Sequence, residues 1–457
     1  MTNRHLAVLA LALLGGCSLI PNYERPAAPI PEHFDGVTEA NAGALPGWRD
    51  FFPDPALHAL IEAALDHNRD LRIAVARVDE ARALAGIARA DRFPTIDGQA
   101  SENRSRTPDD LTGTGRARTS SRYDVNLGIT AFELDFWGRV AALSEAAKAQ
   151  YLASEEAAKS FRVSLISDVA STWFQLAEMT ERERLAGDTL KSREDSVEIL
   201  RKRRDAGIAT DLDVLTADGL TETVRVQAAD IKRQRLQTEN ALRLLTGMAV
   251  ALPQATTVSS QPAMIELAPG LPSEVLLRRP DVRAAEQRLI AANANVGAAR
   301  AAFFPRISLT AALGTASAAL SGLFGGGSEA WLFQPVLKLP LFDSGRTQAS
   351  LDVAEARKVV AVADYEKTIQ QAFRETADAL AARSTYREQL AAQEASLRAT
   401  QTRLDRVKAR EQNGIANYLE VLDASRDAFA AEQLLVSTRR QALNAQIAVY
   451  KALGGGE

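Results

Sequence analysis

Hydrophobic residues recur at spacings of three and four through two long stretches that contain no proline. One stretch runs from Gly138 to about Asp205, and its apolar positions include Phe161, Leu165, Val169, Trp173 and Leu176. The other runs from Gly345 to about Asn413, and charged residues separate the apolar positions in both. This spacing predicts helices of about 65 residues, each roughly 100 Å long. Each must bury an apolar stripe against other helices.

Glycines follow the long helical stretches. Past Gly207 and Gly414 the pattern predicts a turn and a shorter helix that runs back, ending at Gly247 in the first case and at Gly454 in the second. A tight reversal between helices often needs a positive φ angle, which glycine adopts at low cost. The sequence therefore predicts two helical hairpins.

Two alanine-rich stretches, residues 57–92 and 273–303, predict further helices that can approach their neighbours closely. The first leads into Pro94 and the second into Pro305. Proline lacks a backbone donor and disfavours the helical conformation in the residue before it. We therefore expect each helix to end there and a strand to begin.

Two strands are expected after each proline, because apolar and polar residues then alternate. The apolar positions are Tyr123, Val125, Leu127, Ile129 and Ala131 in the first copy and Ile307, Leu309, Ala311 and Leu313 in the second. This alternation suits strands with lipid on one side and a water-filled lumen on the other. An ordinary half-buried antiparallel sheet would show it too. The Gly/Ser-rich residues 321–328 would form an exposed turn.

The chain is an internal duplication. Three features recur 207 positions apart: Gly-Arg at 138 and 345, Gly-Ile-Ala at 207 and 414, and the final glycine at 247 and 454. The two prolines, Pro94 and Pro305, are 211 positions apart. The segment between the proline and the Gly-Arg pair is therefore four residues longer in the first copy. Recurrence in one order at one offset indicates a duplicated protomer.

Four strands are too few to close a barrel, and open sheet edges are not tolerated in lipid. Closure therefore requires several copies of the chain. Two copies would supply eight strands, but long helices around a wide lumen favour three copies and twelve strands.

The chain has 457 residues, 46% hydrophobic and 25% charged, with a formal net charge of −4. This balance gives no reason to expect nucleic acid as a partner. The four histidines never come within metal-ligand spacing, and the single cysteine allows neither an intrachain disulfide nor a thiolate metal site. No nucleophile with a base and no phosphate-binding glycine loop is evident, so we expect neither an enzyme nor a cofactor.

The N-terminus has the features of a lipoprotein signal peptide over residues 1–16. A basic start and a short apolar run, too short to span a bilayer as a helix, precede Cys17. Residues 14–17 (LGGC) resemble a bacterial lipobox, in which Cys17 is acylated, with palmitate, and becomes the mature N-terminus. By resemblance to sorted lipoproteins, Ser18 in place of aspartate favours the outer membrane. The lipid anchors the chain and does not span the membrane.

The rest of the chain divides where its composition changes. Proline-rich residues 17–56 predict an extended segment that lies on the folded body. Residues 57–250 form the first structural repeat, with a helix, a strand pair, a long helix and a return helix. Residues 251–272 are expected to be a linker, and residues 273–457 the second repeat and the C-terminal tail.

Three motifs carry a resemblance to a known family: residues 277–283 (LRRPDVR), 340–346 (PLFDSGR) and 417–424 (NYLEVLDA). Residues 20–26 (IPNYERP) resemble the opening of mature efflux lipoproteins. The chain resembles TolC-family outer-membrane efflux channels, most closely the lipoprotein branch that includes OprM and NodT-like proteins. The resemblance covers nearly the whole mature chain. It implies an α+β membrane protein, a homotrimeric 12-stranded outer-membrane β-barrel continuous with a long periplasmic α-helical barrel, with a mixed equatorial region near residues 253–272.

The implied function is the passive exit duct of a tripartite efflux pump for small toxic compounds or drugs. In the family the channel docks onto a periplasmic adaptor, a membrane fusion protein, and an inner-membrane pump supplies the energy; an RND-type pump is expected here. The partners expected are two further copies of the chain, the adaptor, the pump and outer-membrane lipid. The adaptor-docking tips are Gly207, Ile208, Ala209, Gly414, Ile415 and Ala416.

The resemblance also implies a periplasmic gate. Family gate carboxylates lie six and nine residues after the second glycine, at Glu420 and Asp423 here, and the first-repeat counterpart is Asp213. Solvated acids on a helix surface would look the same in sequence. The family pairs a tyrosine and an arginine near the second glycine with the first-repeat acid, but Glu411 and Ala416 occupy those positions. The candidates to replace that pairing are Arg203, Arg204 and Arg410.

Other functions stay open at this level. The main alternative is the outer-membrane component of a type I protein secretion system. A periplasmic adaptor would also be lipidated and carry a long helical hairpin, but it should have one hairpin between β-rich domains and not two equal copies. A general porin would lack the long helices. The substrates cannot be read from the sequence, because the duct lining is generically polar.

Overall fold

The computed structural model of the chain describes residues 18–31, 34, 46–247, 257–262, 264–265 and 273–456. The signal peptide, Cys17 and most of the linker therefore lie outside the described residues. The chain forms two compact units. Unit 1 is Met1–Ala27, Arg77–Glu155 and Ala284–Glu366, and unit 2 is Ala28–Ala76, Glu156–Arg283 and Lys367–Glu457. Each unit thus contains segments from both halves of the chain.

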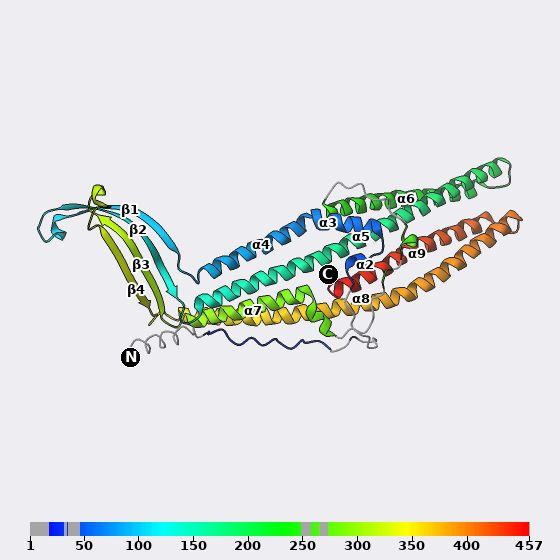
Figure 1. Cartoon of the computed structure of the whole chain (residues 1–457). Helices are drawn as coiled ribbons and strands as arrows, with labels where there is room; N and C mark the ends of the chain where they lie inside the picture. The colour runs from blue at the N-terminus through cyan, green and yellow to red at the C-terminus, as the bar shows by residue number, and fades with distance from the viewer. Residues whose placement is uncertain are drawn as a thin grey trace. The chain divides into compact units, whose positions relative to one another are not determined.

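The predicted order of helices and strands is confirmed (Figure 1). The first copy contains α4 (Arg69–Ala90), β1 (Ile96–Thr107), β2 (Arg118–Leu134), α5 (Arg139–Asp205) and α6 (Asp211–Thr246). The second contains α7 (Pro280–Ala301), β3 (Arg306–Ser317), β4 (Glu329–Lys338), α8 (Arg346–Gln412) and α9 (Tyr418–Ala452). The remaining helices are α2 (Trp48–Phe51), α3 (Pro55–His67) and the short 3-10 helices η1 (Asp109–Leu111), η2 (Val258–Ser260), η3 (Ser273–Arg278) and η4 (Leu320–Gly322). The two long helices, α5 and α8, have 67 residues each.

In unit 1 the four strands form one antiparallel sheet in the order β1-β2-β3-β4. The central pair joins the two sequence repeats, with Tyr123 of β2 opposite Ser317 of β3 and Leu134 opposite Ile307. The predicted turn at residues 321–328 lies between β3 and β4. Among the described residues, β1 and β4 are the edges of this sheet, and their outer backbone groups have no strand partner.

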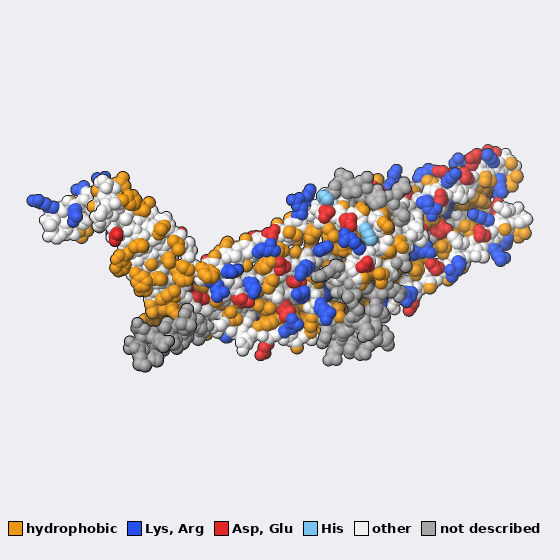
Figure 2. All heavy atoms as spheres, in the orientation of Figure 1, with side chains coloured by type: hydrophobic (Ala, Val, Ile, Leu, Met, Phe, Trp, Pro, Cys, Tyr) orange, Lys and Arg blue, Asp and Glu red, His pale blue; other side chains and the backbone are white. Residues whose placement is uncertain are grey.

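One face of the sheet is apolar and exposed to its surroundings. Directly opposed residues of neighbouring strands share a face, and one such row is Gly98, Leu127, Leu313 and Trp331. The adjacent row, on the other face, is Gln99, Asn126, Gly314 and Ala330. The side chain of Trp331 is 77% exposed, and hydrophobic side chains gather over the visible side of the strands (Figure 2). The predicted two-faced alternation is therefore confirmed.

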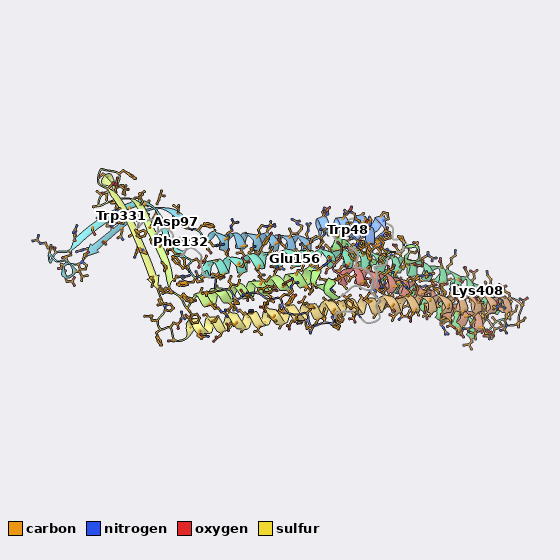
Figure 3. The ribbon with its side chains drawn as sticks, turned by 60° about the horizontal axis from the view of Figure 1, so that its bottom comes forward. Trp48, Asp97, Phe132, Glu156, Trp331 and Lys408 are labelled. Atoms are coloured by element: carbon orange, nitrogen blue, oxygen red, sulfur yellow. The ribbon has the colours of Figure 1, made fainter. Side chains whose placement is uncertain are left out.

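A β-bulge in β2 changes which residues share the apolar face. The pairing register shifts between Ile129 and Phe132, and Ala131 has a positive φ of 50°. The backbone N–H of Ala131 donates to Oγ1 of Thr310 at 3.1 Å. The expectation that Ala131 continues the alternation was wrong. Before the bulge the odd-numbered residues of β2 lie on the apolar face, and after it the even-numbered residues do. Phe132, which is drawn on the sheet in Figure 3, and Leu134 continue the apolar face instead.

Unit 1 also contains closely packed helices. Ala146 and Ala149 of α5 are buried against Ala291 and Ala294 of α7, and Ile20 packs against this cluster. Alanine has no side chain beyond Cβ, so two helix backbones can come close together. The predicted close approach is thus confirmed for the alanine-rich helix of residues 273–303, whose α-helical part is α7.

Residues 18–27, which we call the N-terminal strap, are extended and bound to α7. Tyr23 donates a hydrogen bond to the carboxylate of Glu286 at 3.1 Å, and Arg25 donates to the same carboxylate at 2.7 and 3.0 Å. Glu286 is itself buried. The prediction of an extended segment on the folded body is confirmed for the strap.

In unit 2 the main core forms where α2, α3, α5 and α9 meet. The ring of Phe51 stacks on Tyr450 with the ring centroids 4.5 Å apart. Trp173 of α5 is fully buried, and its Nε1 donates to the carboxylate of Asp54 at 2.9 Å. Asp54 also caps the start of α3. The core thus fixes the C-terminal end of α9 against the middle of α5.

The helix expected over residues 57–92 is interrupted at Asn68, giving α3 and α4. The Oδ1 of Asn68 accepts from the N–H of Leu71 at 2.8 Å, which caps the new helix, and its Nδ2 donates to the carbonyl of Leu245 at 2.9 Å. A continuous helix could not make both contacts, and the second comes from a helix 177 positions away. The expectation of one helix was therefore wrong.

Two further boundaries differ from the expectation. The helix expected over residues 273–303 begins as the 3-10 helix η3 and becomes α-helical only at Pro280. The segment expected to be extended over residues 17–56 contains α2. Within the part of the chain that the structure describes, no helix combines the length and apolar composition needed to cross a membrane.

Candidate functional site: the hairpin tips

Both hairpins of unit 2 reverse through the same backbone motif, and Figure 1 shows the two turns at the ends of α5 and α8. At the first tip the N–H of Gly207 donates to the carbonyl of Arg204, and the N–H of Ile208 to that of Arg203, each at 2.8 Å. The φ angles of Gly207 and Gly414 are 75° and 72°. This Schellman motif needs a left-handed residue at the turn, which glycine supplies. The predicted glycine reversals are confirmed.

The return helices are capped differently at the two tips. Thr210 and Asp213 form a capping box, in which Thr210 Oγ1 accepts from the N–H of Asp213 at 3.2 Å and the Asp213 carboxylate accepts from the N–H of Thr210 at 2.9 Å. Hydrogen bonds from the hydroxyl and the N–H of Thr210 hold the pKa of Asp213 below its ordinary value. At the second tip, Asn417 accepts from the N–H of Leu419 at 3.1 Å. Asp213 is therefore ionised while it caps α6.

An ion pair joins the two hairpins near their tips. Nη1 of Arg203 lies 2.6 Å from the carboxylate of Glu411, and the Glu411 side chain is only 14% exposed. Arg204 instead pairs with acids of its own hairpin, and Arg410 lies 3.9 Å from Glu420. Of the three arginines named as candidates from the sequence, Arg203 is thus the one that forms an ion pair with the other hairpin of the same chain.

Tyr418 connects the same two hairpins through apolar packing. One cluster that it contacts draws on both hairpins and contains Val197, Leu200, Val214, Ala217 and Leu422. The other belongs to the second hairpin and contains Val407, Val421 and Ala424. Burial raises the pKa of the Tyr418 hydroxyl. Sequence reasoning missed Tyr418, although an aromatic residue at the start of a helix that is otherwise rich in charge was a usable signal.

Apolar side chains are exposed at both tips, and Ile208 is 77% exposed. The other exposed apolar residues there are Leu212, Leu215, Ile415 and Leu419. The two tips are not equivalent, because Leu215 is exposed whereas Leu422, its counterpart 207 positions later, is buried between the hairpins. Exposed apolar groups of this kind mark interaction surfaces.

The remaining tip residues are less exposed. Ala209 is half-buried against the cluster that joins the hairpins, and Ala416 is half-buried after the second glycine. A larger side chain at Ala209 would therefore disturb the packing of the tip itself. Ile208 and Ile415 are the better positions at which to test contact with a partner.

The gate candidates of the second repeat lie on the first turns of α9. Glu420 is 3.9 Å from Arg410, and Asp423 is 3.3 Å from Arg426. Residues three apart on a helix are neighbours on its surface, so these two carboxylates share one face. Asp213 lies on the other hairpin. Among the residues with described positions, no group of three or more His, Cys, Asp and Glu side chains could hold a metal ion.

The motif at residues 277–283 anchors three elements of unit 2. Arg279 is buried, and it donates to the carbonyl of Ala452 at 2.7 Å, to Asp281 at 2.7 Å and to Glu375 at 2.8 Å. The carboxylates of Asp281 and Glu375 raise the pKa of Arg279 against the opposing effect of burial. The sequence marked this motif as the start of a repeated helix and through the family resemblance, but it did not show the contacts of Arg279. The structure shows that Arg279 ties the start of α7 to α8 and to the end of α9.

Comparison with known proteins agrees with this architecture. The family model described as "Outer membrane efflux protein" matches residues 60–248 and 271–455. The "Solvent efflux pump outer membrane protein SrpC" of Pseudomonas putida is 46% identical over 472 aligned positions, which cover 100% of this chain and 99% of SrpC.

Solved structures share the fold. A membrane protein from Pseudomonas aeruginosa superposes with a TM-score of 0.91 at 44% identity, covering 96% of this chain and 98% of the other. The open state of the MtrE outer membrane channel of Neisseria gonorrhoeae superposes with a TM-score of 0.87 at 37% identity, covering 96% and 98%. The long helical hairpins and the four-stranded sheet are thus those of an outer-membrane efflux channel. On sequence and on fold, the chain belongs to the outer membrane efflux protein family.

Proposed function

We propose that this chain is the exit duct of a tripartite efflux pump and that it conducts small toxic compounds passively out of the cell. The observation that supports this most directly is the sheet of unit 1, whose apolar face is exposed and whose edge strands β1 and β4 are unpaired among the described residues. An exposed apolar face suits the hydrocarbon core of a membrane.

Closure of this sheet requires further copies of the chain. Unpaired backbone groups at a sheet edge are too costly in lipid, so β1 of one copy would pair with β4 of the next. Three copies would give twelve strands, and the helices of the same three copies would enclose the periplasmic part of the duct. In this assembly the polar face of the sheet lines the lumen.

The hairpin tips would bind a periplasmic adaptor, and through it an inner-membrane pump, of RND type. Apolar residues exposed at both tips supply the contact, and the difference between Leu215 and Leu422 gives each tip its own surface. SrpC, the relative from Pseudomonas putida, is named as part of a solvent efflux pump. The duct needs no chemical step and no cofactor, because energy comes from the pump; we therefore propose that it is not an enzyme.

The gate would consist of Glu420 and Asp423 from each of three copies, with Asp213 adding charge from the first tip. Asp213 keeps its negative charge because the hydrogen bonds that it accepts as the cap of α6 lower its pKa. A ring of six carboxylates at a threefold constriction would attract cations and narrow the lumen. Opening would then require the two hairpins to separate.

Cys17 would carry the lipid anchor in the outer membrane. Closure of the barrel should hold the channel far more strongly than acyl chains do. Mass spectrometry of the mature N-terminus should find an acylated cysteine, and a Cys17→Ala chain exported on a cleavable signal should still reach the outer membrane. An unmodified Cys17, or release of the variant into the periplasm, would refute the corresponding half of this proposal.

The function is tested with the purified full-length protein and with a strain that lacks it. Negative-stain images should show threefold particles, and planar bilayers should show a small, cation-preferring conductance. Cells without the chain but with the adaptor and the pump should accumulate toxic solvents or drugs, and expression of the chain should reverse this. Monomeric particles without conductance, or unchanged accumulation on deletion, would contradict the proposal.

A further inference from the structure

A cavity of about 780 Å³ opens in unit 2 between α5, α6 and α9, away from the hairpin turns. Its apolar lining includes Leu220, Val224, Ile231, Phe429 and Leu434. This volume lies within the range of pockets that take small organic ligands. The lining is apolar over most of its area, but three arginines, Arg182, Arg193 and Arg426, also contribute to it.

Arg193 is the unusual member of this set. The residue is only 4% exposed, and its Nε and Nη1 atoms are buried without a hydrogen-bond partner. Burial lowers the pKa of Arg193, and the like charge of Arg426 also lowers it. A buried guanidinium in this condition lacks the counter-charge that normally offsets the loss of water.

The other charged groups in the cavity are already paired. Arg182 donates to Gln433 at 2.6 Å and lies 3.4 Å from Glu178. Arg426 lies 3.3 Å from Asp423 and 3.1 Å from Asp427. Asp230, the acid in the lining, pairs with Arg233 and accepts from Gln234 at 2.6 Å. None of these acids pairs with Arg193, so among the described residues of the cavity lining its positive charge has no carboxylate partner.

We propose that this cavity binds a small amphipathic anion, whose carboxylate or sulfonate pairs with Arg193 while its hydrocarbon part fills the apolar lining. A guanidinium presents donors in a planar fork that fits such oxyanions. Hydrocarbon against the valine, leucine and phenylalanine side chains would add the area-dependent part of the affinity. This inference does not depend on the proposed pump or on the gate, because the cavity lies within unit 2 of a single chain.

The test uses the full-length channel in a neutral detergent, with octanoate as the probe, measured by isothermal titration calorimetry. Octanoate should bind saturably with one site per chain, and acetate and octylammonium should not compete for that site. Arg193→Gln should lower the affinity for octanoate about tenfold or more, because a charge-assisted hydrogen bond is lost. The matched control is Arg184→Gln, which removes an equal, exposed charge from α5 and should leave the affinity unchanged.

A second variant keeps the proposal testable if Arg193→Gln does not assemble. Leu434→Trp, at an exposed position of the lining, should fill the cavity and abolish octanoate binding while the trimeric particles and the conductance stay normal. Arg193→Gln should also raise or preserve the thermal midpoint without ligand, since it removes an uncompensated buried charge. The proposal is overturned if the wild-type channel does not bind octanoate saturably, if acetate binds as tightly, or if Arg184→Gln weakens binding as much as Arg193→Gln.

Discussion

Arg203 of α5 and Glu411 of α8 form an ion pair 2.6 Å long that joins the two hairpins of one chain, one turn before their glycines. The family resemblance implies a tyrosine at the Glu411 position, paired with the first-repeat acid, whereas here Glu411 pairs with Arg203. Because the pair crosses between hairpins, it opposes their separation. Because the pair lies close to the tips, we propose that it helps to hold the gate closed.

Breaking this pair should make the duct leakier. Glu411→Gln or Arg203→Gln should raise the resting conductance in planar bilayers, while the pair itself contributes about 1 kcal/mol or less to stability. The double variant Arg203→Glu, Glu411→Arg should restore the closed state. Arg201→Gln is the control, because Arg201 pairs with Asp218 within its own hairpin. If the charge-swapped channel leaks as much as either single variant, the pair does not hold the gate.

The acids of α9 should make the duct sensitive to multivalent cations. At an effective dielectric constant near 20, two carboxylates some 8 Å apart repel by roughly 2 kcal/mol before salt screening, and a multivalent cation relieves this. The channel should therefore be blocked from the periplasmic side, and Glu420→Ala, Asp423→Ala should lose the block but still form trimers. Asp188→Ala, at another exposed acid paired with an arginine, should keep it. If multivalent cations still block the double variant, the acids that bind them are Asp213 or others, and not Glu420 and Asp423.

Polar substitution at the tips should weaken adaptor binding without affecting the channel itself. Ile208→Asp and Ile415→Asp each place a charge on an exposed apolar contact, and each should reduce adaptor crosslinking about fivefold or more, as for a contact worth more than about 1 kcal/mol. Channel abundance should not change, because both side chains are exposed. Leu244→Asp alters an exposed leucine elsewhere on α6 and should have no effect. Normal crosslinking and efflux in both tip variants would exclude the tips as the docking site.

Loss of the Arg279 anchor should destabilise unit 2. Arg279→Gln leaves the carboxylates of Asp281 and Glu375 without their partner and removes the donor to the carbonyl of Ala452. The carboxylates that remain are partly exposed, so water offsets some of the loss, and the cost should be about 1–3 kcal/mol, which a lowered thermal midpoint should report. Arg278→Gln alters the exposed neighbouring arginine and should have little effect. Equal midpoints for the two variants would show that the buried contacts of Arg279 contribute little.

A side chain at Gly297 should displace the N-terminal strap. An added Cβ there would lie 2.6 Å from Cγ1 and 2.7 Å from Cα of Ile20, closer than real Cβ atoms come. Gly297→Ala should therefore expose the strap to limited proteolysis near Arg25. Gly86→Ala, with open space around its Cβ, should leave the strap protected and gain about 0.5–1 kcal/mol of helix stability. Equal protection in both variants would mean that α7 tolerates the methyl group.

The sequence by itself determined the long helices, their return helices, the strands and the order of these elements. These elements follow from local properties of the sequence: hydrophobic spacing of three and four in the helices, alternation in the strands, and glycine at positions 207 and 414. Each property depends only on the backbone geometry of its own segment. The constant offset of 207 positions then implied that both halves build the same elements. For this reason α5 and α8, with their return helices, were predictable without any contact between them.

The tertiary structure decided what depends on partners far away in the chain. The bulge at Ala131 places Phe132 on the apolar face only because β2 must pair with β3, and Asn68 breaks a helix because it also bonds the carbonyl of Leu245. The sequence offered three arginines for the tip, and packing of the two hairpins selected Arg203. The unpaired guanidinium of Arg193 is likewise invisible in sequence, since burial and the absence of a counter-charge arise only when α5, α6 and α9 come together.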